Sequence, residues 1–178
     1  MAVLFELVVN FGANHAAAEQ AHATVLNHPR LQAGEHQIPL HEPRLMTTRS
    51  KDGNEYLEMA VLPVGVGIGG AMDHGRRIIE LTAEELSELG HGLYGLLRQL
   101  TGYHAAQVGW DPEGRVDLDE LRSDWSDELA TGRLPGLTLA EEIHQELQGF
   151  GFTRFAPGYV WIPYRGEQSS PWSPDQPA

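Results

Sequence analysis

The sequence predicts an α+β fold with a ferredoxin-like βαββαβ core, followed by C-terminal helices and an extra extended segment. Short segments with period-two alternation of apolar residues predict strands. Two segments with helical spacing and N-terminal caps fall between them, in the order strand, helix, strand, strand, helix, strand. The chain has 178 residues, enough for one domain with a hydrophobic core. We expect a single α+β domain over residues 1–166 and a disordered tail over 167–178, which is rich in Ser and Pro.

The N-terminal elements are predicted by alternation and capping. Apolar residues alternate from Val3 to Phe11, which is typical of a half-buried strand. Asn14 is the predicted N-cap of an alanine-rich helix from His15 to about residue 27. Pro29 then ends this helix.

The rest of the core follows from turn and capping signals. Residues 36–49 predict an irregular edge strand, because Pro39 and Pro43 cannot donate to a ladder. A turn at 51–54 leads to a return strand at 55–62. The sequence from Thr82 to Glu85 is a capping box, and leucines from 86 to 100 repeat at helical spacing. Residues 103–110 predict the fourth strand.

Beyond residue 110 the sequence predicts two more helices and an aromatic extended segment. The helices are expected at about 118–130 and 139–148, with Thr138 as the cap of the second. The aromatic segment, 152–164, is interrupted by Pro157 and Gly158. We expect it to cover the core, with an exposed aromatic binding surface as the alternative.

The composition excludes several function classes. A formal net charge of −13 disfavours binding to nucleic-acid phosphates and to anionic membranes, and it favours a basic protein partner or a cation. The same charge is also explained by solubility alone. Cysteine is absent, which removes disulfides, thiolate nucleophiles and Cys-ligated metals. No secretory leader and no membrane-length apolar run is present, so we expect a cytoplasmic protein.

A glycine-rich segment matches G-x-G-x-x-G at Gly65, Gly67 and Gly70. A dinucleotide site needs the last glycine at a helix N-terminus, where backbone amides meet the pyrophosphate. The predicted helix cap, Thr82, lies twelve residues later. We therefore predict a loop or a bulged strand end here, and no bound nucleotide. The sequence identifies no cofactor, and it contains no nucleophile elbow or P-loop.

The predicted first helix carries a possible metal site. His15, Glu19 and His22 fall at i, i+4 and i+7 on one helical face. Two imidazoles and a carboxylate could hold a divalent metal, and this face is the basis for an alternative function as a small metal-dependent enzyme. The competing interpretation places His22 at the margin of the core.

A second cation hypothesis concerns the turn after the fourth strand. Aligned on Gly114, the carboxylates of Asp111, Glu113, Asp117 and Glu120 occupy positions 3, 5, 9 and 12 of a calcium loop. Position 1, however, is Gly109, which offers no carboxylate. The alternative is a plain turn in which Asp117 caps the next helix.

Two glutamates in predicted strands form a further candidate site. If the first and third strands are neighbours, Glu6 and Glu58 lie on the same face, away from the first helix. Paired carboxylates on a sheet could bind cations or share a proton. The alternative is that both are ordinary solvent-facing positions of an antiparallel sheet.

The predicted helix at 118–130 supports our principal functional hypothesis. Its acidic residues predict a docking face for a basic protein partner, with a solvated surface as the alternative. The protein would then be a non-catalytic, protein-binding or regulatory domain, comparable in charge to immunity proteins and inhibitors. A small-ligand binder, with a pocket between the sheet and the C-terminal segment, is the remaining alternative. The residues of the predicted docking face are Asp119, Glu120, Asp124, Asp127 and Glu128.

Overall fold

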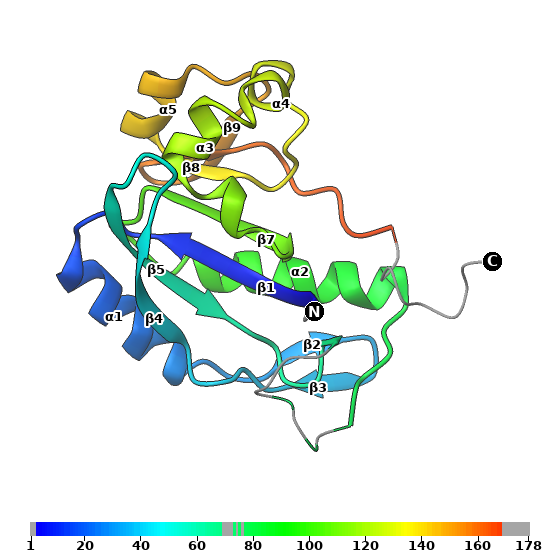
Figure 1. The fold of residues 1–178 in the computed structure, drawn as a ribbon. Helices are drawn as coiled ribbons and strands as arrows, with labels where there is room; N and C mark the ends of the chain where they lie inside the picture. The colour runs from blue at the N-terminus through cyan, green and yellow to red at the C-terminus, as the bar shows by residue number, and fades with distance from the viewer. Residues whose placement is uncertain (1–2, 69–72, 74, 76, 169–178) are drawn as a thin grey trace.

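The computed structural model describes residues 3–68, 73, 75 and 77–168 (Figure 1). In chain order the elements are β1 (Val3–Asn10), α1 (His15–Leu26), β2 (Leu31–Ala33), β3 (His36–Ile38), β4 (Arg44–Arg49), β5 (Glu55–Val61), β6 (Gly67–Ile68), α2 (Ala83–Leu97), β7 (Ala105–Trp110), a 3₁₀ helix (Glu113–Arg115), α3 (Leu118–Arg122), α4 (Ser126–Thr131), β8 (Thr138–Ala140), α5 (Glu141–Leu147), β9 (Thr153–Ala156) and β10 (Tyr159–Trp161). Within these residues, a run of strands separates α1 from α2, and short helices and strands follow β7.

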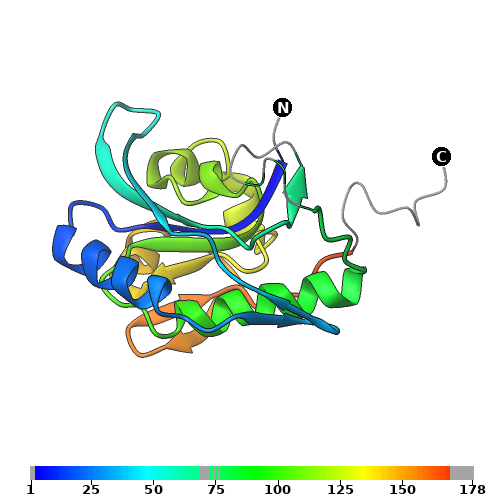
Figure 2. The same ribbon diagram turned by 90° about the horizontal axis from the view of Figure 1, so that it is seen from below.

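One large antiparallel sheet organises the molecule. Its strands follow the order β4-β5-β1-β7-β8-β10-β9, and the short strand β6 pairs with the beginning of β1. Strand β1 is therefore central, with β5 on one side and β7 on the other. Strands β2 and β3 form a separate hairpin. Helices α1 and α2 lie on one face of the sheet, and α3 lies over the other (Figure 2).

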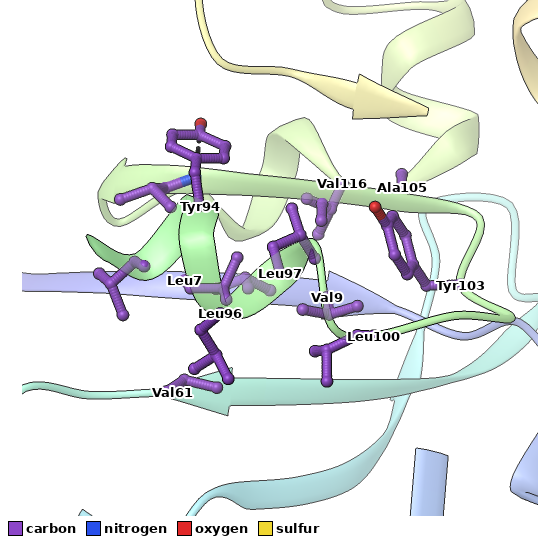
Figure 3. Close-up of a cluster of buried hydrophobic side chains, with 14 of the residues drawn as sticks. Leu7, Val9, Val61, Tyr94, Leu96, Leu97, Leu100, Tyr103, Ala105 and Val116 are labelled. Carbon is purple, nitrogen blue, oxygen red and sulfur yellow. Dashed lines mark hydrogen bonds between the residues drawn. The ribbon is translucent and has the colours of Figure 1, made fainter. Parts of the chain in front are cut away.

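The core fills the space between the sheet and α2. Leu7 and Val9 of β1 point to this face because successive strand residues alternate between faces. They meet the apolar stripe of α2, which the helical spacing of its leucines produces (Figure 3). The buried residues of that stripe include Leu86, Leu89, Leu93, Leu96 and Leu97.

Local sequence signals set the helix boundaries as predicted. The Asn14 side chain accepts a hydrogen bond from the Ala17 N–H and caps α1. Thr82 and Glu85 form the predicted capping box at the start of α2. Gly65 and Gly67 lie far from any such cap, because the next α-helix begins at Ala83. Gly70 of the glycine-rich motif lies outside the described residues, as does most of the predicted tail, from residue 169 onwards.

The α+β class is confirmed, and the sheet is larger than a four-stranded ferredoxin-like core. The predicted strands are present, although the segment 36–49 is split into β3 and β4 around its two prolines. Beyond β7, the sheet continues through β8, β10 and β9, and α3, α4 and α5 accompany this extension. The sequence therefore predicted the elements better than the extent of the sheet.

Two predicted helices differ from those observed. The helix expected at 118–130 is broken into α3 and α4, because Trp125 donates its N–H to the Glu120 carbonyl across a wider turn. The helix expected at 139–148 begins only at Glu141. Thr138 does not cap it; its hydroxyl is buried in β8 and donates to the Gly136 carbonyl at 3.1 Å.

The aromatic segment covers the core, as predicted. It folds into β9 and β10, and its aromatic rings surround Tyr94 of α2. Phe155, Trp161 and Tyr164 each lie within 6.2 Å of the Tyr94 ring, measured between ring centroids. Phe155, Tyr159 and Tyr164 are buried, whereas Phe152 and Trp161 are half-buried.

Candidate functional site

Buried polar side chains line the sheet face that lies opposite α1 and α2. Asn10 of β1 is paired directly with Glu58 of β5, and residues opposite each other in an antiparallel pair share a face. Glu6 lies on the same face, because it is four positions before Asn10 in the same strand and side chains of a strand alternate between faces. The prediction that Glu6 and Glu58 share a face is therefore confirmed. Both are buried, with 2% and 5% of their surface exposed, rather than solvent-facing.

Two further carboxylates lie beside Glu6, supplied by the segment that follows β7. Carboxylate oxygens of Glu6, Asp111 and Glu113 all lie within 4.8 Å of one another. Asp111 and Glu113 are exposed, so the cluster opens to solvent on one side. We call these three side chains the Glu6 cluster.

The backbone at Asp111 makes this arrangement possible. Asp111 adopts a left-handed conformation, with φ of 42°, which is uncommon for a residue with a side chain. Its N–H donates to the Leu4 carbonyl at 3.0 Å, and its carboxylate accepts from the Leu4 N–H at 2.9 Å. These bonds fix the turn that carries the 3₁₀ helix, and with it Glu113, back over β1.

The buried carboxyl of Glu6 is electrostatically unusual. Burial, followed by the neighbouring charges of Glu113, Asp111 and Glu58, raises the pKa of Glu6 to about 8. Its Oε1 atom is buried and has no hydrogen-bond partner. A buried acceptor without a partner is rare and destabilising in folded proteins.

The space in front of Glu6 is open on the β7 side. Gly109 lies directly opposite Glu6 and offers no side chain. The nearest side-chain atom to the position that a Cβ of Gly109 would occupy is Nη2 of Arg115, at 3.8 Å. That nitrogen donates to the Trp110 carbonyl at 3.1 Å, which holds the guanidinium near the end of β7.

The chemistry of the Glu6 cluster suits a hard divalent cation. Carboxylate oxygens are the ligands that Mg²⁺, Mn²⁺ and Ca²⁺ prefer, and open positions are commonly completed by water. With its pKa raised to about 8, Glu6 is mainly protonated near neutral pH when no cation is bound; a cation would displace this proton and share the charge of all three carboxylates. Glu6, Asp111 and Glu113 are the residues that would hold it.

The chain matches no known protein family model, curated protein or solved structure. Among the described residues, no helix is both long and apolar enough to span a bilayer.

The predicted metal face of α1 lies elsewhere. Glu19 and His22 line a shallow cavity of about 620 Å³ between α1 and β4, together with Arg44 and Met46. His15 is exposed and does not line this cavity. Within the described part of the chain, the Glu6 cluster is the only group of three possible metal ligands whose donor atoms all lie within 4.8 Å of one another.

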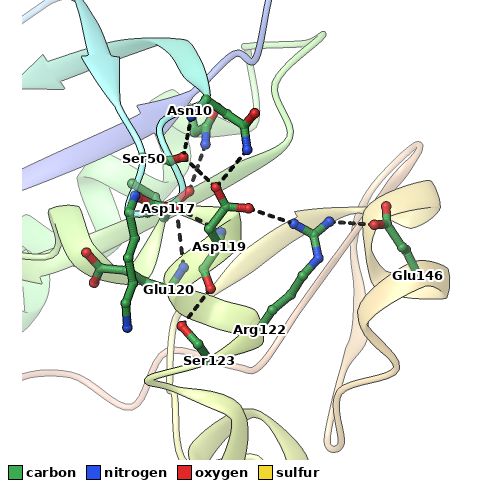
Figure 4. Close-up of polar contacts among 11 residues, drawn as sticks. Asn10, Ser50, Asp117, Asp119, Glu120, Arg122, Ser123 and Glu146 are labelled. Carbon is green, nitrogen blue, oxygen red and sulfur yellow. Dashed lines mark hydrogen bonds and ion pairs between the residues drawn. The ribbon is translucent and has the colours of Figure 1, made fainter.

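The predicted acidic docking face is divided by internal contacts. Figure 4 shows Asp119 beside Ser50, the residue that follows β4, and Arg122 of α3. Asp119 also accepts from the Asn54 amide at 3.1 Å, and Asp124 forms an ion pair with Lys51. These two carboxylates attach α3 and its C-terminal end to the turn between β4 and β5.

Of the remaining acidic residues of that face, Glu120 lies near Lys51 and Trp125. None of Glu120, Asp127 and Glu128 takes part in an ion pair among the described residues. Asp127 and Glu128 belong to the first turn of α4, where their charge also stabilises the positive end of the helix.

The calcium-loop hypothesis contained part of the Glu6 cluster. Asp111 and Glu113 lie in the cluster, but Asp117 caps α3 by accepting from the Asp119 N–H at 2.8 Å. The missing ligand is Glu6, which is more than 100 positions away along the chain. A buried glutamate in an otherwise apolar strand was the available signal, and only the pairing of β1 with β7 connects it to the turn.

Proposed function

We propose that the protein binds a divalent cation through Glu6, Asp111 and Glu113. The observation that supports this most strongly is the Glu6 carboxyl, which is 2% exposed, has an oxygen without a partner, and faces two other carboxylates. A cation would satisfy the unpaired oxygen and neutralise the mutual repulsion of the cluster. The ligands come from β1, the end of β7 and the 3₁₀ helix, so a bound cation would connect these segments.

The proposed role is non-catalytic and regulatory. A calcium, magnesium or manganese ion held by these carboxylate oxygens would stabilise the region where β1 and β7 meet. We further propose that the protein is cytoplasmic, since its sequence has no cysteine for a disulfide, and that it does not bind nucleic acid, since its net charge of −13 repels phosphate. We also propose that the order β4-β5-β1-β7 represents a ferredoxin-like core enlarged by later elements.

The experiment is a calorimetric titration of chelator-treated protein with Mn²⁺ and with Ca²⁺. We expect one of these cations to bind with one-to-one stoichiometry, and Glu6→Gln to weaken binding more than roughly tenfold. Asp127→Asn is the matched control, since it removes an exposed carboxylate outside the cluster. His22→Ala tests the competing site on α1. Equal affinity in wild type and Glu6→Gln, or loss of binding in His22→Ala alone, would refute the proposal.

A second candidate function is the docking of a basic protein on α4. It is supported by the free carboxylates of Asp127 and Glu128 and by the strongly acidic chain. Asp124 is a poor probe of this surface because it holds Lys51, the only lysine in the sequence. Charge reversal at Asp127 and Glu128 should reduce capture of a basic partner and remove its salt dependence. Unchanged capture at low salt would exclude this candidate.

A further inference from the structure

A small polar cavity lies beside Arg115 and contains no residue of the Glu6 cluster. Strand β8 pairs only with Ala105 and Ala106 of β7, so among the described residues no strand pairs with positions 107–110 of β7 on that side. The C-terminal segment 164–167 passes this edge (orange to red in Figure 1). Between them is a cavity of about 210 Å³. We call it the β7-edge cavity.

Gln107 places a buried acceptor in the wall of the β7-edge cavity. Its side chain is 1% exposed, and its amide N–H donates to the Pro135 carbonyl at 3.0 Å. This bond fixes the orientation of the amide, and it leaves Oε1 buried without a partner. A buried amide oxygen that lacks a donor favours a ligand carrying an N–H group.

Arg115 places a positive charge in the same cavity. None of the ion pairs within the described residues involves Arg115, although burial lowers the pKa of its guanidinium. Among the described residues, one of the five N–H donors of Arg115 is used, in the bond to the Trp110 carbonyl. The carboxylates of Glu167, Glu113 and Asp111 act on this guanidinium without forming an ion pair with it among the described residues. Its remaining N–H donors can therefore meet an anionic ligand, and a carboxylate fits the planar fork best.

Glu167 completes the cavity with a fixed carboxyl group. Its N–H donates to the Ser87 hydroxyl at 2.8 Å, and its side chain accepts from the Tyr164 hydroxyl at 3.0 Å. These bonds attach the C-terminal segment to α2 and orient the carboxyl beside Tyr164. The cavity thus carries a positive group and two oxygen acceptors in one small volume.

We propose that the β7-edge cavity binds a free α-amino acid with a small side chain, whose carboxylate meets Arg115 and whose ammonium group meets Gln107 and Glu167. The separated donors and acceptors require a ligand with both charges. The volume of about 210 Å³ lies below the range of roughly 300–1,000 Å³ that is typical for drug-sized ligands, so the ligand must be compact. This inference does not rest on the proposed cation site, since no residue of the Glu6 cluster lines the cavity.

The first test varies the ligand. Glycine, L-alanine and L-serine are titrated calorimetrically into the full chain, together with the N-acetyl and carboxamide derivative of each. We expect at least one free amino acid to bind, and both of its blocked derivatives to bind more than roughly tenfold more weakly. Absence of binding by all three amino acids, or equal binding of the blocked forms, overturns the proposal.

The second test varies the protein. Arg115→Met should abolish amino-acid binding, whereas Arg115→Lys should retain a weaker affinity because the charge remains. Arg165→Met is the matched control. Arg165 is an exposed arginine in the C-terminal segment 164–167, and its side chain does not line the cavity. If Arg115→Met does not fold, Glu167→Gln replaces it as the test and should lose amino-acid affinity to a comparable degree. Unchanged affinity in the folded variants refutes the site.

A Mn²⁺ titration of the same variants separates this proposal from the cation site. Arg115→Met should keep cation binding, since Arg115 is no cation ligand and its positive charge opposes the cation near Asp111 and Glu113. Loss of amino-acid binding with cation binding intact therefore supports the β7-edge cavity alone. Loss of cation binding in Glu6→Gln with amino-acid binding intact supports the two sites as independent.

Discussion

Gly109 lies directly opposite Glu6 in the antiparallel pairing of β7 with β1, so the one buried carboxyl of the cluster faces a position without a side chain. A larger residue at this position would project from the same face of the sheet as Glu6. The glycine therefore keeps the entrance to the Glu6 carboxyl free, and its replacement tests the geometry of the cluster without removing a ligand.

Substitution of Gly109 should separate stability from cation binding. Gly109→Ala should raise the free energy of unfolding by about 0.5 kcal/mol, because alanine loses less backbone entropy and meets only Arg115 at 3.8 Å. Gly109→Leu should weaken Mn²⁺ binding by filling the space before Glu6. Urea denaturation and calorimetry measure the two effects. Wild-type cation affinity in a folded Gly109→Leu protein would contradict the proposed position of the ion.

Glu6 should make the cation-free protein less stable as the pH rises. An ionised Glu6 is disfavoured in the folded state, where its pKa is raised from 4.5 to about 8. Its contribution to folding is fully present below the lower value and is lost as the pH rises towards the higher one. Each pH unit in this window changes the free energy of unfolding by up to about 1.4 kcal/mol. Urea denaturation in the presence of a chelator measures this change.

The Glu6→Gln variant provides the comparison for this pH dependence. Glu58, Glu120 and Glu167 also have raised pKa values, mainly through burial, and they remain in both proteins. The difference between the pH profiles of wild type and variant therefore reports Glu6 together with its interactions with neighbouring carboxylates. Parallel pH profiles for the two proteins would show that Glu6 titrates normally.

Asp111 should have two separable roles. Asp111→Asn should keep the turn, because asparagine tolerates the left-handed conformation and its carbonyl can accept from the Leu4 N–H. The same variant should bind Mn²⁺ more weakly, since it removes one negative charge. Asp111→Ala should in addition lose about 1–2 kcal/mol of stability through the strained backbone. Unchanged Mn²⁺ affinity in Asp111→Asn would assign Asp111 to the turn only.

The attachment of α3 to the β4–β5 turn should depend on Asp119. Asp119→Ala should lower the free energy of unfolding by about 1–3 kcal/mol, because Ser50, Asn54 and Arg122 all lose their shared acceptor. Asp127→Asn is the control and should change stability by less than about 0.5 kcal/mol, since its carboxylate is exposed. Similar effects of both substitutions would indicate that Asp119 is an ordinary surface residue.

Most elements were predictable from the sequence because their signals are local. The alternation in β1, the capping box of α2 and the two prolines before β4 each fix structure within a few residues. The extension of the sheet was not predictable in the same way. Strand β8 has only three residues, and its position depends on β10, which pairs with it from later in the chain.

The candidate site was only partly predictable for the same physical reason. The shared face of Glu6 and Glu58 follows from strand periodicity once the two strands are known to be neighbours. The contact of Glu6 with Asp111 and Glu113 depends on the left-handed turn at Asp111. Aspartate can adopt this conformation, but its presence in a sequence does not predict it. The break after Arg122 depended on a backbone bond from Trp125 to Glu120, and helical periodicity alone favoured a continuous helix.

The pairing of β1 with β7 also determines when during folding a cation can be held. The proposed ligands of the cation come from positions far apart in the chain. The hydrogen bond between Leu4 and Asp111, which joins the same two segments, spans 107 residues. Such long-range contacts form late, after the entropy of a large loop has been lost. A cation bound there would therefore slow unfolding more than it would accelerate folding. Added Mn²⁺ would lengthen the lifetime of the native state and leave the refolding rate almost unchanged.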